Sequence, residues 1–409
     1  MKTVEVHAGW LKTQSLIGRC YIDKARGKEI ISFSYDPLWL SLHPDLVLDP
    51  ELIMTDSRQY PPDGKACFGF LSDAAPDRWG RKLMERIEGF DSSKEGRSRR
   101  TLTESDYILG VHDKGRIGGL RFYDPASNMY LSYRDSLAAP PMKRLREIEH
   151  DAFMLSGKDL TDEEKWTRNL IDPGSSLGGA RPKANILDEN GNIWIAKFPA
   201  KDDTSDVGAW EMVAHDLASE CGINTPDAML MRLSDSGSTF LSKRFDRDKD
   251  KRIHYASAMT MLGATDTDHE GFGYVDIASM IEEISATPEE DLKELWRRMV
   301  FNICISDNDD HLRNHGLILG KTGWHLSPAF DVNPEPEKAG RGLDIGDGSR
   351  RDLESAYACA GLFRTGDAEA KKQIQKTRST IAGRWGDLAS KYGISKAEQK
   401  RISHIFAIV

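Results

Sequence analysis

Cysteine is scarce in this chain of 409 residues. The five cysteines (Cys20, Cys67, Cys221, Cys304 and Cys359) are scattered along the sequence, are odd in number and never form a CxxC pair. This pattern excludes a disulfide framework, a zinc ribbon and a thioredoxin-type motif. It favours reduced, mostly buried thiols in a cytoplasmic protein.

Long apolar runs and an excess of basic charge are also missing. No stretch approaches the roughly 20 apolar residues that span a bilayer, and the first residues lack the apolar core of a secretion signal. Lys and Arg number 56 against 65 Asp and Glu, so the net charge is −9. An acidic chain is a poor candidate for nucleic-acid binding over its whole surface. We expect a soluble, cytoplasmic protein of roughly two to three domains with no membrane association.

The type of secondary structure that the sequence predicts changes along the chain. Residues 1 to about 50 alternate in short β-branched and aromatic runs, which is typical of strands. Between 183 and 245 the pattern predicts a hairpin across Asn190-Gly191, then a helix ending at Gly222, then a second hairpin. Beyond about 255 the apolar residues recur mainly with helical spacing.

Residues 174–183 form a loop of small residues that ends in Arg-Pro-Lys. Small side chains let successive backbone N–H groups approach an anion closely. The loop is not a Walker A motif, because no Gly-Lys-Ser/Thr closes it and a strand follows. A flexible surface loop is the alternative interpretation.

Lys197 lies near the end of the predicted strand 193–198. The strand period places it on the same face as Ile193 and Ile195. An ammonium beside apolar side chains needs either water or an anionic partner. Glu211, in the helix that follows, is a candidate partner, as in the Lys–Glu pair of protein kinases. The alternative is a lysine that reaches outward to water.

The residues that point most strongly to catalysis lie in the segment 306–315, which directly follows a predicted apolar helix. Asp309 and Asn314 are five positions apart, as are the Asp and Asn of the kinase catalytic loop. A hairpin over 317–326 follows and leads to Asp331, where a second magnesium carboxylate is expected.

Two alternatives to a kinase-type catalytic loop stay open for this segment. Asp307 or Asn308 could cap a helix, or His311 and His315 could bind zinc. The sequence lacks HExxH, and oxygen-rich surroundings suit magnesium better than zinc. We expect His315 to pack at the start of the hairpin.

Five motifs in this order resemble HipA-type serine/threonine kinases, the toxin component of bacterial HipA–HipB toxin–antitoxin systems. They are residues 175–184, 196–199, 243–247, 309–316 and 326–331. Residues 35–37 and 75–81 resemble the N-terminal subdomain of the same family, so the likeness covers nearly the whole chain.

The resemblance implies an α+β, two-lobed protein-kinase-like fold. Residues 1–125 would form an N-terminal β-rich subdomain, 150–250 the kinase N-lobe and 251–409 a mostly helical C-lobe with the catalytic loop. Nucleotide and substrate would meet between the lobes.

The resemblance also implies roles for single residues. Asp309 would be the catalytic base, Asn314 and Asp331 would bind Mg²⁺, and Lys197 would contact the ATP phosphates. Ser176 would be autophosphorylated, with Ser175 beside it as the alternative. The remaining nucleotide contacts are assigned to Ser176, Gly178, Gly179, Ala180, Lys183, Lys243, Phe245, Asp246 and His311, with Lys243 and Phe245 near adenine and Asp246 near the ribose.

As implied functions, we expect an ATP- and Mg²⁺-dependent kinase that pairs with a HipB-like helix-turn-helix antitoxin. Characterised relatives phosphorylate an aminoacyl-tRNA synthetase, halt translation and induce dormancy. Operator DNA would be reached only through the antitoxin complex, with the basic residues 94–100 as a contact. Two alternatives remain: an inactive kinase fold that binds antitoxin or DNA, and a divalent-metal hydrolase using Asp307, Asp309, Asp310 and His311.

Overall fold

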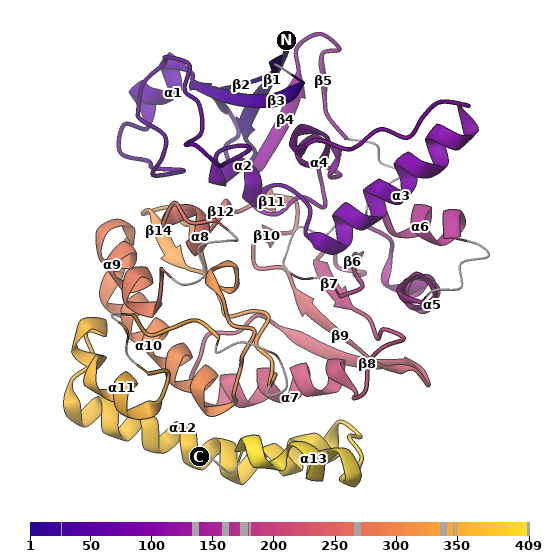
Figure 1. The fold of residues 1–409 in the computed structure, drawn as a ribbon. Helices are drawn as coiled ribbons and strands as arrows, with labels where there is room; N and C mark the ends of the chain where they lie inside the picture. Colours follow the sequence, from indigo (N-terminus) through magenta and orange to yellow (C-terminus); the bar gives the residue numbers. More distant parts are fainter. Residues whose placement is uncertain are drawn as a thin grey trace. The chain divides into compact units, whose positions relative to one another are not determined.

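The computed structural model describes residues 1–25, 27–132, 139–157, 163–171, 179, 181–265, 271–335, 342–346, 348 and 350–406. The chain divides into two compact units, and each unit combines two chain segments. Unit 1 comprises Met1–Asp202 and Arg244–Ala256, and unit 2 comprises Asp203–Lys243 and Ser257–Val409. Figure 1 labels the elements of both units. The three-part division implied by the sequence stays a prediction.

An antiparallel five-stranded sheet, in the order β3-β2-β1-β4-β5, forms the N-terminal part of unit 1. Alternate residues of β1 turn inward, so that Val4, Val6 and Ala8 are fully buried, as the period of two requires. The predicted strands near the N-terminus are therefore confirmed. The strands are β1 (Lys2–Ala8), β2 (Leu16–Ala25), β3 (Lys28–Tyr35), β4 (Leu120–Asp124) and β5 (Met129–Tyr130).

The helices of unit 1 follow this sheet along the chain. The longest, α3, begins at Asp77, whose Oδ1 accepts the Gly80 N–H at 2.8 Å and so caps the helix. Helix α6 packs against both α3 and α5. The helices are α1 (Pro37–Leu42), α2 (Gly69–Asp73), α3 (Arg78–Lys94), α4 (Glu104–Gly110), η2 (Met142–Arg144), α5 (Leu145–Ser156) and α6 (Glu163–Ile171).

Two hairpins complete unit 1. Strands β6 (Lys183–Leu187) and β7 (Ile193–Lys197) pair across the predicted turn, where Gly191 has φ +81°. Asp188 Oδ1 accepts the main-chain N–H of Asn190 at 2.9 Å and of Asn192 at 2.8 Å, which fixes the turn and the register of the strands. The second hairpin joins β10 (Arg247–Asp248) to β11 (Lys251–Arg252), and β12 (Tyr255–Ser257) follows.

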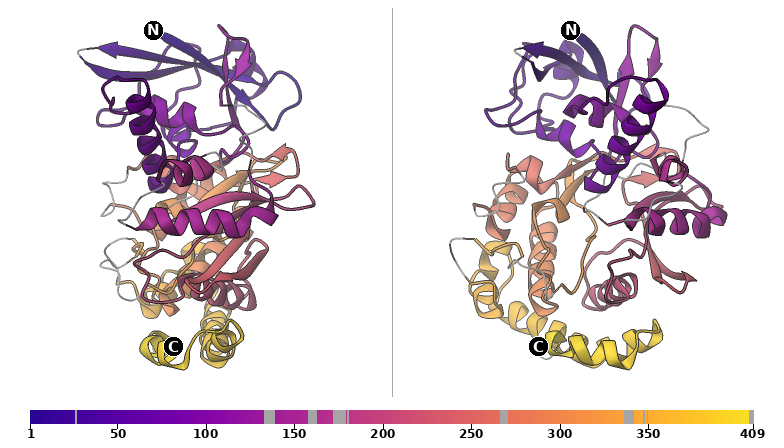
Figure 2. Two further views of the ribbon diagram at one scale, coloured as in Figure 1. Left: turned by 90° about the vertical axis from the view of Figure 1, so that its right-hand side faces the viewer. Right: turned by 45° about the vertical axis from the view of Figure 1, so that its right-hand side comes forward.

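Unit 2 is mostly helical, as the sequence predicts. Helix α7 ends at the predicted position, because Gly222 adopts φ +87° and Ile223 N–H reaches the carbonyl of Ala218 at 3.0 Å. The apolar helix α10 packs against α9, α11 and α12, and Trp296 is among its fully buried side chains. Figure 2 shows these helices from two further sides.

The elements of unit 2 are α7 (Val207–Glu220), β8 (Ala228–Ser234), β9 (Gly237–Lys243), α8 (Ala258–Met261), α9 (Tyr274–Ile284), α10 (Pro288–Cys304), η3 (Leu312–Asn314), β13 (Gly316–Leu319), β14 (Trp324–Leu326), α11 (Leu353–Ala358), η4 (Ala360–Phe363), α12 (Asp367–Lys391) and α13 (Lys396–Phe406). β8 pairs with β9, and β13 with β14, both in antiparallel hairpins. Among the described helices, none combines the length and the apolar character needed to cross a membrane.

Candidate active site

The end of α10 determines where the aspartate-rich segment begins. Asp307 N–H donates to the carbonyl of Asn302 at 3.0 Å, and Ser306 N–H donates to Ile303 at 3.2 Å. This is the hydrogen-bond pattern of a Schellman turn, which needs a left-handed residue after the helix. Ser306 takes that conformation with φ +53°, although glycine usually occupies it. The chain therefore turns sharply away from the helix at Ser306.

Two main-chain contacts bring the segment after the β13–β14 hairpin back to this turn. Asn333 N–H donates to Asp307 Oδ2 at 3.2 Å, and Glu335 N–H donates to the carbonyl of Ser306 at 3.2 Å. Asp331, at the start of the returning segment, has φ +57°. Such left-handed non-glycine residues cluster at functional sites. The hairpin therefore brings Asp331 to the end of α10.

Asn314 contacts the loop that carries Asp309. Its Nδ2 donates to the main-chain oxygen of Asp309 at 3.3 Å, and its N–H donates to the carbonyl of His311 at 2.8 Å. Its Oδ1 is buried and has no hydrogen-bond partner among the described residues. An unpaired buried carbonyl oxygen is costly, unless a bound group contacts it.

Asn314 and Asp331 line one small cavity within unit 2, of about 10 Å³. That volume is close to the smallest that holds a single water molecule. The polar residues lining it are Arg298, Asn302, Asp307, Asp310, Asn314, His315 and Asp331. The structure thus brings the two predicted magnesium ligands to one cavity, and the loop carrying Asp309 is hydrogen-bonded to Asn314.

Asp307 and Asp310 both line this cavity and are buried, yet their pKa values shift in opposite directions. Burial, and then the nearby Asp310 carboxylate, raise the pKa of Asp307 well above its usual range. Burial also opposes ionisation of Asp310, but His315, Arg351 and Tyr274 outweigh it and hold its pKa at about 2. The negative charge is therefore held on Asp310.

The partners of Asp310 also bear on the two alternative interpretations of the segment 306–315, a helix cap and a zinc site. His315 Nε2 lies 2.8 Å from Asp310 Oδ1, and Tyr274 Oη donates to Asp310 Oδ2 at 2.5 Å. His315 precedes β13 and is 3% exposed, so the prediction that it packs at the hairpin start is confirmed. Asp307 caps no described helix. Among the described residues, no three His, Cys, Asp or Glu side chains are placed to hold a metal.

Unit 1 contains Lys197, which is assigned to the ATP phosphates, and Lys183, which is assigned to the nucleotide. Lys183 and Lys197 are directly opposite each other in the β6–β7 hairpin and share one face. Lys197 is half-buried, whereas Lys183 is 2% exposed and its Nζ lies 2.9 Å from Asp77 Oδ2. The predicted partner of Lys197, Glu211, is buried in α7 of unit 2, and the Lys197–Glu211 pair stays a prediction.

Four assigned residues, Ser175, Ser176, Gly178 and Ala180, lie outside the described residues. Gly179 is exposed with φ +90°, and a Cβ added there would lie 3.3 Å from Lys183 Nζ.

The other assigned nucleotide contacts are placed as follows. Lys243, at the end of β9, pairs with Asp227 Oδ2 at 3.2 Å. The Phe245 ring lies 6.0 Å from that of Tyr255. His311 precedes η3, and its Nδ1 is buried without a hydrogen-bond partner among the described residues.

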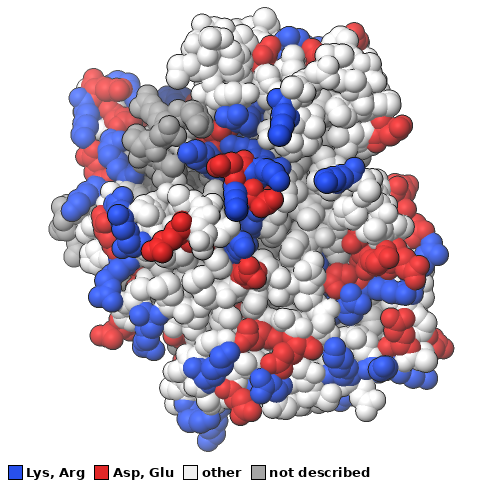
Figure 3. All heavy atoms as spheres, turned by 180° about the vertical axis from the view of Figure 1, so that it is seen from behind, with Lys and Arg blue, Asp and Glu red and all other residues white. Residues whose placement is uncertain are grey.

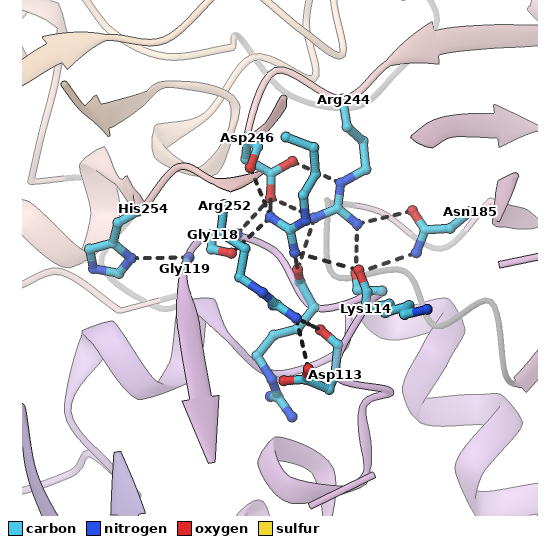
Figure 4. Close-up of polar contacts among 12 residues, drawn as sticks. Asp113, Lys114, Gly118, Gly119, Asn185, Arg244, Asp246, Arg252 and His254 are labelled. Atoms are coloured by element: carbon cyan, nitrogen blue, oxygen red, sulfur yellow. Dashed lines mark hydrogen bonds and ion pairs between the residues drawn. The ribbon is translucent and has the colours of Figure 1, made fainter. Parts of the chain in front are cut away.

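The structure gives Asp246 internal partners, and its assignment to the ribose stays a prediction. Its carboxylate is 1% exposed and accepts hydrogen bonds from Arg244, Arg247 and the Gly118 N–H. Figure 4 shows this network, in which Arg244 also donates to the carbonyl of Gly115 at 2.6 Å.

Three cations of the basic stretch 94–100 have acidic partners. Arg97 pairs with Glu88 at 2.5 Å, and Arg100 with Asp106 at 2.8 Å. Lys94 pairs with Glu164 at 2.5 Å. Figure 3 shows that acidic and basic side chains are intermixed over the face it views. Arg99 instead donates to the main-chain oxygen of Glu85 at 3.1 Å, and the DNA contact of this stretch stays a prediction.

Some residues of the site have no signal in the sequence. Tyr274 lies 36 positions before Asp310, and the buried Arg298 donates to the carbonyl of Ser327 at 2.7 Å. Neither residue belongs to a spaced motif, so only the tertiary fold reveals them. Asp307 and Asp310 are visible in the sequence, but there they suggest a metal hydrolase.

Comparison with known proteins assigns this site to a family. The model of the HipA-like C-terminal domain matches residues 175–385, which include the small-residue loop, the aspartate-rich segment and Asp331. The chain belongs to this HipA-like family. A chain of the solved Shewanella oneidensis MR-1 toxin–antitoxin complex of HipA, HipB and operator DNA is similar over 99% of this chain and 95% of its own, with a TM-score of 0.65 and 14% identity. The fold is accordingly the α+β, kinase-like fold of HipA.

Two curated relatives of this HipA-like chain are named as kinases. A Haemophilus influenzae protein named "Putative kinase" is 26% identical over 189 residues, covering 40% of this chain and 54% of the relative. A Sinorhizobium fredii protein named "Putative kinase Y4dM" is 28% identical over 155 residues, covering 35% of this chain and 37% of the relative. The matches thus span about half or less of these relatives.

Proposed function

We propose that this HipA-like protein is an ATP-dependent serine/threonine protein kinase that uses Mg²⁺. The proposal is carried by Asn314, which lines one cavity with Asp331 and whose buried Oδ1 has no hydrogen-bond partner among the described residues. An amide oxygen and a carboxylate are hard oxygen ligands, the type that Mg²⁺ prefers. Mg²⁺ commonly takes only one or two protein ligands and fills its other positions with water and substrate phosphate. The two residues therefore fit the ion.

In this proposal Asp309 accepts the proton of the substrate hydroxyl. Asp309 is half-buried in the loop that Asn314 contacts, where its carboxylate can orient a serine or threonine side chain. Lys197 holds the nucleotide phosphates from the β6–β7 hairpin. Bound Mg²⁺ would supply positive charge to the transferring phosphoryl group.

The same cavity argues against the metal-hydrolase alternative. Asp310 is engaged by His315, Tyr274 and Arg351, and burial favours the protonated form of Asp307. A hydrolytic metal site needs ionised, available carboxylates. These observations remove Asp307 and Asp310 from the four residues that the hydrolase alternative would use.

As finer parts of the proposal, the kinase is a toxin regulated by a HipB-like antitoxin and by autophosphorylation of Ser176 or Ser175. The antitoxin partner is supported by the fold likeness to the chain from the HipA–HipB–DNA complex. A protein target such as an aminoacyl-tRNA synthetase, and operator DNA reached through the antitoxin, come from the family resemblance. A phosphate in the loop would repel nucleotide phosphates and switch the kinase off.

Incubation of the purified protein with radiolabelled ATP and Mg²⁺ tests the function. We expect label on the protein, located by mass spectrometry in the peptide containing residues 175 and 176. Asp309→Asn should abolish the transfer but retain ATP binding, while the control Asn308→Ala should transfer normally. Released inorganic phosphate without labelled protein would favour the hydrolase, and neither product would favour an inactive kinase fold.

A further inference from the structure

Arg351 contacts both ends of the short loop that carries Asp309. Its Nη2 donates to the main-chain oxygen of Asp307 at 2.8 Å and lies 3.7 Å from Asp310 Oδ2. The side chain of Arg351 is 8% exposed, and that of Asp310 is 1% exposed. The two residues between these contacts are Asn308 and Asp309, the proposed base. One guanidinium group therefore joins the two residues that enclose them.

A glycine leaves the space that this guanidinium group needs. Gly342 has φ +66°, and a Cβ added there would lie 2.7 Å from Arg351 Cζ and 2.7 Å from the main-chain oxygen of Asp307. Both distances are shorter than a real Cβ allows, and the positive φ also favours glycine. Gly342 therefore lies directly against the contact between Arg351 and Asp307.

Residues 342–346 are fixed to the start of α9 by main-chain hydrogen bonds. Tyr274 N–H donates to the main-chain oxygen of Asp344 at 2.9 Å, and Val275 N–H donates to that of Ile345 at 2.8 Å. The side chain of Ile345 is also buried, with 1% of the residue exposed. The glycine beside the guanidinium group therefore belongs to a segment whose position in unit 2 is fixed.

The start of α9 and Arg351 also meet at one carboxylate. Tyr274 Oη donates to Asp310 Oδ2 at 2.5 Å, the oxygen that faces Arg351, whereas His315 Nε2 lies 2.8 Å from Oδ1. Tyr274 and His315 thus hold the Asp310 end of the loop, and Arg351 adds the contact at the other end. Asp307 is 1% exposed, so water cannot easily replace Arg351 as a donor to its oxygen.

We propose that Arg351 is a positioning residue for phosphoryl transfer, which fixes the main chain on both sides of Asp309. The inference rests on the proposed kinase function. In this arrangement Arg351 acts through the loop and contacts neither the nucleotide nor the substrate hydroxyl. When the guanidinium group is removed, the buried oxygen of Asp307 loses this donor and the loop relaxes toward another. Asp309 then no longer meets the hydroxyl in the productive geometry, on which the rate of transfer depends steeply.

The test is Arg351→Gln in the full chain, assayed by the rate of self-labelling from radiolabelled ATP at saturating Mg·ATP. We expect this rate to fall about 100-fold, while the calorimetric Kd for Mg·ATP stays within about threefold of wild type. Arg351→Lys keeps the charge on a shorter side chain and should lower the rate about tenfold. The matched control is Arg350→Gln, which removes the same groups from an exposed position one residue earlier and should change neither quantity.

A folded Arg351→Gln variant that labels itself at the wild-type rate would overturn the inference, even if it melts earlier, because a purely structural contact lowers only stability. A loss of Mg·ATP affinity as large as the loss of rate would also overturn it, since Arg351 would then act on nucleotide binding. If Arg351→Gln does not fold, Arg351→Lys decides in its place, and a wild-type rate in that variant would overturn the inference. A wild type that takes up no label from Mg·ATP would instead refute the proposed function.

Discussion

Asn314 Nδ2 donates a hydrogen bond to the main-chain oxygen of Asp309 at 3.3 Å, and this contact orients the whole amide. Only the NH₂ end can donate to a carbonyl, so Oδ1 must point the other way. There it is buried without a partner among the described residues. The proposed base and the proposed metal ligand are thus linked through one side chain.

Replacement of Asn314 by Ala should uncouple metal-dependent nucleotide binding from folding. The variant loses one long hydrogen bond but also an unpaired buried oxygen, so its stability without ligand should change by less than about 1 kcal/mol. Wild type should gain thermal stability when Mg·ATP is added, because a ligand that binds only the folded state stabilises it. The variant should gain little, and its transfer rate should fall about 100-fold. Thermal melts with and without Mg·ATP measure both effects.

Asn308→Ala is the matched control, since it removes the same atoms from the same loop. It should melt and respond to Mg·ATP like wild type. If Asn314→Ala were stabilised by Mg·ATP as strongly as this control, Asn314 would have no role in holding the ion.

Tyr274 should matter mainly to stability. It is fully buried, donates to Asp310 at 2.5 Å and accepts from Asn302 Nδ2 at 3.0 Å. Tyr274→Phe leaves both partners unsatisfied, so we expect a loss of about 2 kcal/mol in the free energy of unfolding. Urea denaturation measures it. Tyr392→Phe removes a similar bond to Asp216 nearer the surface and should cost clearly less, and equal losses would contradict the buried role of Tyr274.

Local signals in the sequence predicted much of the fold. The Asn190-Gly191 turn defines the β6–β7 hairpin, and Gly222 ends α7 where a left-handed residue is needed. The hairpin between Asn314 and Asp331 also brings these two residues to one cavity, because a short hairpin must bring its two ends together; the part of Asp309 and the roles of all three residues stay a prediction. Such features depend on a few neighbouring residues, which a single sequence displays.

Other features escaped prediction, and several of them join distant segments. The ammonium of Lys183 is buried against Asp77, 106 positions earlier. The carboxylate of Asp246 accepts a hydrogen bond from the main-chain N–H of Gly118, 128 positions earlier. The nucleotide assignments of Lys183 and Asp246 stay predictions. Ser306 holds a left-handed conformation that its side chain does not signal. Burial and long-range pairing decide these roles, and neither can be read from residue type.

The Arg97–Glu88 pair predicts a structural role for the basic stretch. Glu88 is 7% exposed, and the Arg97 guanidinium beside it lowers its pKa to about 2. Arg97→Glu should therefore lower the melting temperature of the protein. The double variant Arg97→Glu/Glu88→Arg should recover part of the lost melting temperature. Arg99→Glu is the control, because Arg99 contacts only a main-chain oxygen among the described residues. If Arg97→Glu left the melting temperature unchanged and weakened operator binding by the antitoxin complex, the structural role would be contradicted and the DNA contact supported.

Asp246 predicts how stability depends on pH. Burial opposes its ionisation, but Arg244 and Arg247 outweigh burial and lower its pKa to about 2, against about 3.9 in the unfolded chain. A lowered folded-state pKa stabilises the protein above the unfolded-state value, and this stabilisation is lost as pH falls through about 2. The contribution amounts to about 2 kcal/mol. Urea unfolding at pH 6, 4 and 2.5 measures it.

The Asp246→Asn variant isolates this contribution from other carboxylates. It leaves two buried guanidinium groups without their counter-ion, so at pH 6 it should be about 3 kcal/mol less stable than wild type. The gap between the two proteins should narrow between pH 4 and pH 2.5, because wild type then begins to lose the same charge. A gap that stayed constant from pH 6 to pH 2.5 would mean that folding does not lower the pKa of Asp246, and would contradict its stabilisation by the buried arginines.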